Sequence, residues 1–172
     1  MRFVITGEWT RNRLLQLIVT LYAIYVGGLW LTNALLYFQK MNLYPSSVVE
    51  YYLGSEERFL SPRSYQGLLE VSHFHLFAMG MLLLVLTHLM LFVPISNRAK
   101  AWLIALPFGA ALLEEGAGWL VRFAHPGFAW LKVSGFLLLQ GSLATLIFVA
   151  LWAVFVGSQR NLNSGLPEDS GG

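Results

Sequence analysis

Nine ionisable side chains lie within or beside the long apolar stretches of this 172-residue sequence. Such groups are costly at membrane depth and mark a functional site by default. Imidazoles and carboxylates ligate haem or transition-metal ions, and they also act as acids and bases in proton transfer. The nine residues are therefore compatible with three kinds of site: a haem site, a metal site, and a quinone or proton-exchange site. They are Glu70, His73, His75, His88, Glu114, Glu115, Arg122, His125 and Lys132.

A haem site is indicated by the histidines of the second apolar stretch. His73 and His88 are about 60° and ~22 Å apart on a regular helix, whereas His75 points about 200° away from His73. With this spacing, residues 71–94 resemble the haem-binding helices of cytochrome b-type membrane proteins. The resemblance implies a b haem with His73, His75, His88 and His125 as its cofactor-binding residues. No second helix carries a matching histidine pair, so only His125 could complete a haem near His73, and a haem at His88 would need another subunit or a methionine.

A metal site is indicated by Glu70 and His73, a carboxylate and an imidazole three residues apart on one helical face. Di-iron helical bundles project such Glu-x-x-His pairs into their core, and they use the motif twice. This sequence contains it once, so it predicts at most a single transition-metal ion. We expect Glu70, His73, Glu115 and His125 to be its ligands.

A quinone or proton-exchange site needs a carboxylate and a histidine at membrane depth, enclosed by aromatic rings. The sequence supplies such rings beside the polar residues, at Phe74, Phe77, Trp119 and Trp130.

A purely structural role is the competing interpretation. Glu115 could pair with Lys132 or Arg122, and His73 could pair with Glu70, so that the polar groups only lock the helices together. Glu114, Arg122 and Lys132 are accordingly the candidate ion-pair or proton-exchange residues.

Four apolar stretches must position these residues: 14–38, 71–94, 101–121 and 133–157. Of the 20 charged side chains in the chain, these stretches contain only Glu114 and Glu115. Each is long enough to cross about 30 Å of hydrocarbon as a helix. The sequence therefore predicts an all-α integral membrane protein, an up-down bundle of four transmembrane helices formed by residues 1–157. This composition, with no cysteine, excludes a soluble globular enzyme, a disordered chain and a disulfide scaffold.

The remaining segments are an outer loop and a tail. The loop, residues 39–70, is rich in tyrosine, which is typical of the headgroup layer, and a short helix is expected through 48–53. Residues 158–172 are expected to form a flexible cytoplasmic tail.

The distribution of basic residues predicts cytoplasmic termini, because arginines precede the first span and the 97–100 loop carries Arg98 and Lys100. The scattered basic residues indicate no nucleic-acid partner. In this orientation seven of the nine ionisable groups converge on the outer layer of the bilayer, all except His88 and Arg122.

The predicted function follows from that layer. We expect a small integral subunit of a bacterial respiratory or other electron-transfer complex in the inner membrane. It would hold a haem, a metal ion or a quinone at the outer face, in contact with lipid and with other subunits. The alternative is a non-redox structural or assembly subunit whose polar cluster only fixes helix packing and partner binding.

Overall fold

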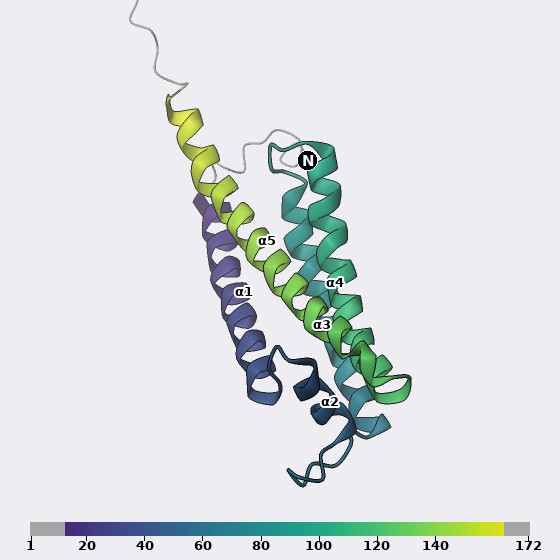
Figure 1. Cartoon of the computed structure of the whole chain (residues 1–172). Helices are drawn as coiled ribbons and strands as arrows, with labels where there is room; N and C mark the ends of the chain where they lie inside the picture. Colours follow the sequence, from purple (N-terminus) through teal and green to yellow (C-terminus); the bar gives the residue numbers. More distant parts are fainter. Residues whose placement is uncertain (1–12, 164–172) are drawn as a thin grey trace, which may run out of the picture.

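The computed structural model describes the backbone of residues 13–163 and the side chains of residues 13–155. Four long helices form an up-down bundle (Figure 1). Each is long and apolar enough to cross a membrane, which confirms the predicted fold of a multi-pass membrane protein. They are α1 (Arg13–Lys40), α3 (Tyr65–Met90), α4 (Asn97–Phe123) and α5 (Ala129–Asn163).

The helices extend beyond the predicted apolar stretches because local signals outside those stretches set their ends. Helix α3 begins at Tyr65, where the Ser64 hydroxyl accepts a hydrogen bond from the Gly67 amide (3.1 Å). Ser96 caps α4 in the same way. Helix α5 continues to Asn163, past the predicted end at 157, and the rest of the predicted tail, 164–172, lies outside the described residues.

The loop between α1 and α3 contains the predicted short helix, α2 (Pro45–Leu53), which begins three residues earlier than expected. Proline is favoured in the first helical turn because its fixed φ suits the helix and its missing N–H is not needed there. The helix ends at Gly54, whose φ of 86° favours glycine. Ser55 and Leu60 then exchange two backbone hydrogen bonds of 3.0 and 2.9 Å, which close a small hairpin. We refer to this end of the bundle as the α2 end.

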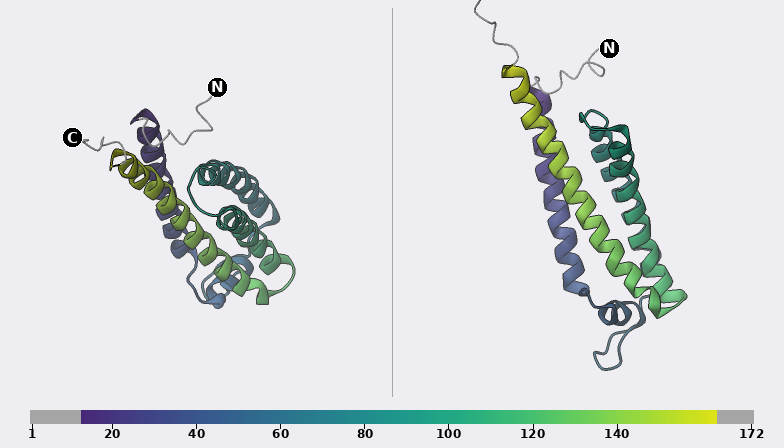
Figure 2. Two further views of the ribbon diagram at one scale, coloured as in Figure 1. Left: turned by 90° about the horizontal axis from the view of Figure 1, so that it is seen from above. Right: turned by 45° about the horizontal axis from the view of Figure 1, so that its top comes forward.

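Helix α5 is the central element of the bundle. It packs against α1 on one side and against α3 and α4 on the other, and its largest interface is with α4. Seen along the bundle, α5 runs between α1 and the pair formed by α3 and α4 (Figure 2, left). Helices α1 and α3 are thus held mainly through their neighbours and have little contact with each other.

Two apolar clusters form the core. The first occupies the half remote from α2 and consists of aliphatic side chains, with Leu86, Met90 and Leu146 almost fully buried. The second lies at the α2 end and is more aromatic, with Tyr37 stacked on Phe136 at 3.7 Å between ring centroids. Five of the predicted polar residues lie beside this second cluster: Glu70, His75, Glu114, Glu115 and Lys132.

A close crossing of α4 and α5 brings two of those polar residues together. A Cβ atom added at Gly135 of α5 would lie only 3.0 Å from the Cα atom of Glu114 in α4. Only glycine therefore allows the two backbones to approach this closely.

Candidate functional site

A cavity of about 700 Å³ lies at the α2 end, between α1 and α3 and beneath α2. Its walls include helices α1 to α5 and residues 61–64. Five of the nine ionisable residues singled out from the sequence line it, together with several aromatic rings. The five are Glu70, His75, Glu114, Glu115 and Lys132.

Lys132 and Glu114 form an ion pair inside this region. The Lys132 ammonium contacts Oε1 of Glu114 and also donates a hydrogen bond to the main-chain carbonyl of Glu114 at 2.9 Å. Both residues are buried, with exposed fractions of 5% and 8%. The pair joins α4 to α5 one turn away from Gly135, where the backbones are closest. The carboxylate and the ammonium neutralise each other, so Glu114 carries no uncompensated charge into the protein interior.

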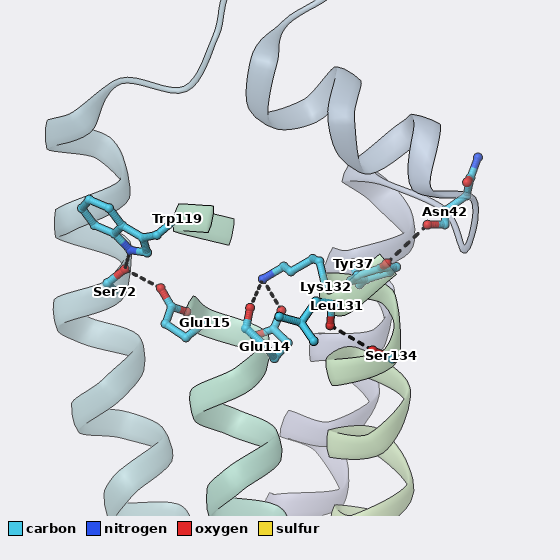
Figure 3. A network of polar contacts seen from close by, with 9 residues as sticks. All are labelled: Tyr37, Asn42, Ser72, Glu114, Glu115, Trp119, Leu131, Lys132 and Ser134. Carbon is cyan, nitrogen blue, oxygen red and sulfur yellow. Dashed lines mark hydrogen bonds and ion pairs between the residues drawn. The ribbon is translucent and has the colours of Figure 1, made fainter. Parts of the chain in front are cut away.

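Glu115 points the other way, toward α3 (Figure 3). Its Oε1 accepts a hydrogen bond from the hydroxyl of Ser72, and the Ser72 oxygen in turn accepts one from Nε1 of Trp119 at 2.8 Å. Ser72 is buried. These two hydrogen bonds hold the carboxylate in place, but its hydrogen-bonding partner is uncharged. The carboxylate of Glu115 is therefore not neutralised by Lys132.

His75 lies one helical turn after Ser72 on α3 and faces the same cavity. Its Nε2 atom is buried and has no hydrogen-bond partner among the described residues. One potential ligand atom from each of His75, Glu114 and Glu115 lies within 4.8 Å of the other two. Two ligands of one ion are at most about 4.4 Å apart, so small side-chain rotations would bring all three atoms onto one metal ion.

Helix α2 and residues 61–64 cover the end of the cavity. The ring of Tyr52 packs directly against Gly118 of α4, where an added Cβ would lie 2.6 Å from the phenol oxygen. Burial raises the pKa of the Tyr52 hydroxyl above its ordinary value. Arg63 holds this cover in place through three contacts. Its amide donates to the carbonyl of Tyr52 (3.0 Å), its carbonyl accepts from Nε of Arg122 (2.7 Å), and its guanidinium lies 4.0 Å from the ring centre of Tyr51.

The other predicted site residues lie away from the shared ligand atoms. Glu70 lines the cavity but accepts a hydrogen bond from Gln66 (2.9 Å). His73 and His88 are exposed. His125 is exposed too, and its Nδ1 accepts a hydrogen bond from the Gly127 amide, which caps a short 3-10 helix, η2 (Pro126–Phe128).

The structure thus differs from two of the expected pairings. The predicted partner of Glu115, Lys132, contacts Glu114 instead, because the Gly135 crossing places α5 on the Glu114 side of α4. The other candidate partner, Arg122, donates to the carbonyl of Arg63. In addition, His75 rather than His73 faces the acidic residues, since the packing of α3 against α4 turns the Ser72–His75 face inward.

Sequence reasoning missed Ser72 and Tyr52 as site residues. Ser72 is uncharged, so it did not stand out among the ionisable groups, although its position three residues before His75 places both on one helical face. Tyr52 was one of several tyrosines expected at the membrane surface, and nothing local distinguished it from them.

Comparison with known proteins identifies a family for this chain, and the match lies in its transmembrane region. Residues 42–161 match a protein family described as a transmembrane helical domain. The matched segment runs from just before α2 almost to the end of α5, and it contains every residue of the cavity described above except those of α1 and Met41. No curated protein and no solved structure matches the chain.

Proposed function

The chain belongs to this family of transmembrane helical domains, and we propose that it is a small integral subunit of a membrane electron-transfer assembly. In this proposal His75, Glu114 and Glu115 bind a single transition-metal ion. The observation that carries the proposal is the convergence of their three potential ligand atoms within 4.8 Å, with the buried Nε2 of His75 lacking a partner among the residues that the structure describes. Buried polar groups without partners are uncommon in proteins and call for an explanation, and a bound ion is one.

The charges of the site support a cation. Lys132 neutralises Glu114, which leaves the carboxylate of Glu115 with only the neutral Ser72 hydroxyl. An unpaired charge beside apolar helices is costly, and a bound cation would remove that cost. One imidazole and two carboxylates suit Fe²⁺, Mn²⁺ or Zn²⁺ better than a soft ion such as Cu⁺.

The two carboxylates are also oriented as metal ligands usually are. Each has one oxygen held by a group from a neighbouring helix, Lys132 for Glu114 and Ser72 for Glu115, and each keeps a second oxygen. Such outer contacts fix the direction of first-shell ligands. Three protein ligands leave at least one coordination position open, which is the arrangement of reactive rather than structural metal sites.

A b haem with two histidine ligands is less well supported by this geometry. Only His75 of the four histidines lines the cavity, whereas His73, His88 and His125 are exposed. Haem at this site would need a second axial ligand of another kind.

The proposal places the site at the outer face of the bacterial inner membrane, with both termini in the cytoplasm. In this proposal the electrons come from or go to another subunit. Helix α1 offers a surface for lipid or for that subunit, since most of its apolar side chains are exposed, including Ile24 and Leu35 at 68% and 59%.

Metal analysis tests the proposal directly. The full chain is purified in detergent and its iron, manganese, zinc and copper contents are measured, together with a reduced-minus-oxidised visible spectrum. We expect an equimolar amount of one metal, which is lost in His75→Ala and in Glu115→Gln but kept in His73→Ala. His73 is the matched control because it lies two residues away on the same helix and is exposed.

Two results would contradict the metal site. A Soret band that disappears in His75→Ala would show that the site binds haem and not a single metal ion. A colourless preparation that stays folded and takes up no metal on addition of Fe²⁺, Mn²⁺ or Zn²⁺ would contradict metal binding. The polar cluster would then have a structural role only.

A further inference from the structure

The cavity next to the three potential ligands is much larger than a metal ion requires. Its volume of about 700 Å³ falls within the range of about 300–1,000 Å³ that small-molecule sites occupy. Its lining combines apolar and aromatic side chains with polar and charged groups that can orient a bound molecule. The size and lining therefore call for a molecule beyond the ion.

The position of the cavity indicates where that molecule comes from. Asn33 and Leu36 of α1 form one wall, and Val71 and His75 of α3 form the facing wall. Asn33 lies seven residues before the end of α1, about 10 Å into the span. Leu36 and Val71 are 55% and 59% exposed, and they belong to helices that would be surrounded by lipid. The space between α1 and α3 therefore faces the hydrocarbon of the bilayer.

The polar groups at the inner wall restrict the chemistry of the molecule. The charged side chains that line the cavity balance one another, with Lys40, Arg63 and Lys132 against Glu70, Glu114 and Glu115. A cavity without net charge favours an uncharged molecule over a phosphate or a carboxylate, which would bring in an uncompensated charge. The carboxylate of Glu115 accepts hydrogen bonds, and Nε2 of His75 is free to accept one when it is unprotonated. The molecule should be uncharged, soluble in lipid, and equipped with hydroxyl groups that donate hydrogen bonds.

The aromatic lining favours a flat ring. Trp119 and Tyr52 border the cavity, and the stacked pair of Tyr37 and Phe136 forms part of its wall. Aromatic rings bind other flat rings by stacking or edge contacts, worth about 0.5–1.5 kcal/mol beyond the burial of surface. A hydroxylated aromatic ring on a lipid-soluble tail meets all of these requirements.

We infer that this cavity binds the headgroup of a membrane quinol, which reaches it from the bilayer between α1 and α3 and donates hydrogen bonds toward His75 and Glu115. The inference rests on the proposed function in that it names the substrate class of the same electron-transfer site. It concerns binding to the metal-free chain, in which His75 keeps the nitrogen lone pair that a bound metal ion would occupy.

Binding of decylubiquinol to the full, metal-depleted chain in detergent tests this inference by isothermal titration. We expect saturable binding with one site per chain. Loss of a hydrogen bond to a charged acceptor should weaken binding about tenfold in Glu115→Gln. The exposed position of Val71 allows a second variant, Val71→Phe, which should obstruct the opening by at least a similar factor without disturbing the core. Val85→Phe is its matched control, because Val85 is an exposed valine of the same helix that does not line the cavity.

The outcomes separate this inference from the metal site. Saturable binding that Val71→Phe weakens and Val85→Phe does not supports the quinol site, even if the chain binds no metal. Absence of saturable binding, or equal effects of the two phenylalanine variants, would overturn it, even if the metal site stands. Displacement of decylubiquinol by the anionic lipid phosphatidylglycerol at equal concentration would also overturn it, because the cavity would then be a phospholipid headgroup site.

Discussion

The ammonium group of Lys132 contacts Glu114 twice, through the side-chain carboxylate and through the main-chain carbonyl of the same residue. The lysine of α5 is thereby tied to both the side chain and the backbone of α4. This double contact exists because Gly135, three residues further along α5, lets the two helices approach closely.

Removal of either charge of this pair should destabilise the bundle. Lys132→Met or Glu114→Gln leaves the other group buried without its charged partner, which costs about 3–5 kcal/mol in comparable buried pairs. The double variant should recover much of this loss because no unpaired charge remains. Thermal unfolding in detergent measures the effect, with Lys40→Met as a control at an exposed lysine. Equal stability of the wild type and both single variants would show that the pair does not hold α4 to α5.

Glycine-to-alanine variants of α5 should have effects of opposite sign. At Gly135 the added methyl group would meet the backbone of Glu114 at 3.0 Å, so α5 must move away and the free energy of unfolding should fall by about 1–3 kcal/mol. At Gly141 nothing lies within 4 Å of the added group, and alanine favours the helix by about 0.5–1 kcal/mol. Chemical unfolding of the two variants in mixed micelles compares them. A loss of stability in Gly141→Ala equal to that in Gly135→Ala would contradict the close crossing.

The pKa of the buried Tyr52 should lie above the ordinary value for tyrosine. Burial raises its pKa above the ordinary value of 10.0, so a spectrophotometric titration of the wild type minus Tyr52→Phe should place its ionisation above that pH. The folded protein then keeps this proton more tightly than the unfolded chain, and stability should fall as the pH rises beyond about 10. Gly118→Ala would displace the ring, as its contact of 2.6 Å indicates, and lower the pKa toward the ordinary value. Gly116→Ala, with nothing within 4 Å, serves as the control.

Ser72→Ala should weaken the proposed metal site without removing a ligand. The hydroxyl orients the carboxylate of Glu115 and accepts from Trp119. Loss of such an outer contact typically lowers metal affinity by about 10–100-fold. Competition with a chelator of known affinity measures the change, and Ser134→Ala, at an exposed serine of α5, should leave the affinity unchanged. An unaltered affinity in Ser72→Ala would mean that Glu115 does not ligate the ion.

The absence of cysteine from the sequence allows a direct test of orientation. Glu57→Cys places one thiol in the exposed hairpin after α2, and Asn97→Cys places one at the exposed start of α4, at the other end of the bundle. With both termini in the cytoplasm, a maleimide that cannot cross membranes should label intact spheroplasts at residue 57. Residue 97 should react only after permeabilisation, and the reverse pattern would invert the proposed topology.

The sequence predicted the fold well because a membrane span depends on a property that is visible locally. A run of about 20 apolar residues without charge is sufficient to identify a transmembrane helix. The gathering of Glu114, Glu115, Lys132 and a histidine near one end of the bundle was also predictable, since antiparallel helices bring the ends of successive stretches together.

The pairing within that group was not predictable, because it depends on how each helix is rotated about its axis. His73 and His75 lie on opposite sides of α3, and periodicity alone does not state which side faces the bundle. Glu114 and Glu115 differ by about 100° in direction, so the position of α5 decides which of them meets Lys132. That position follows from the contact between Gly135 and the backbone of Glu114, a feature of tertiary packing.

The two core clusters divide the bundle into a half that holds the helices together and a half that contains the cavity. The aliphatic cluster remote from α2 joins α3, α4 and α5 through residues such as Leu86 and Leu146, and none of the residues that line the cavity belongs to it. Substitutions around the cavity can therefore accumulate while this half of the bundle keeps its packing. A scaffold of this kind is evolvable: related chains could acquire different ligands at the α2 end and still assemble in the membrane in the same way.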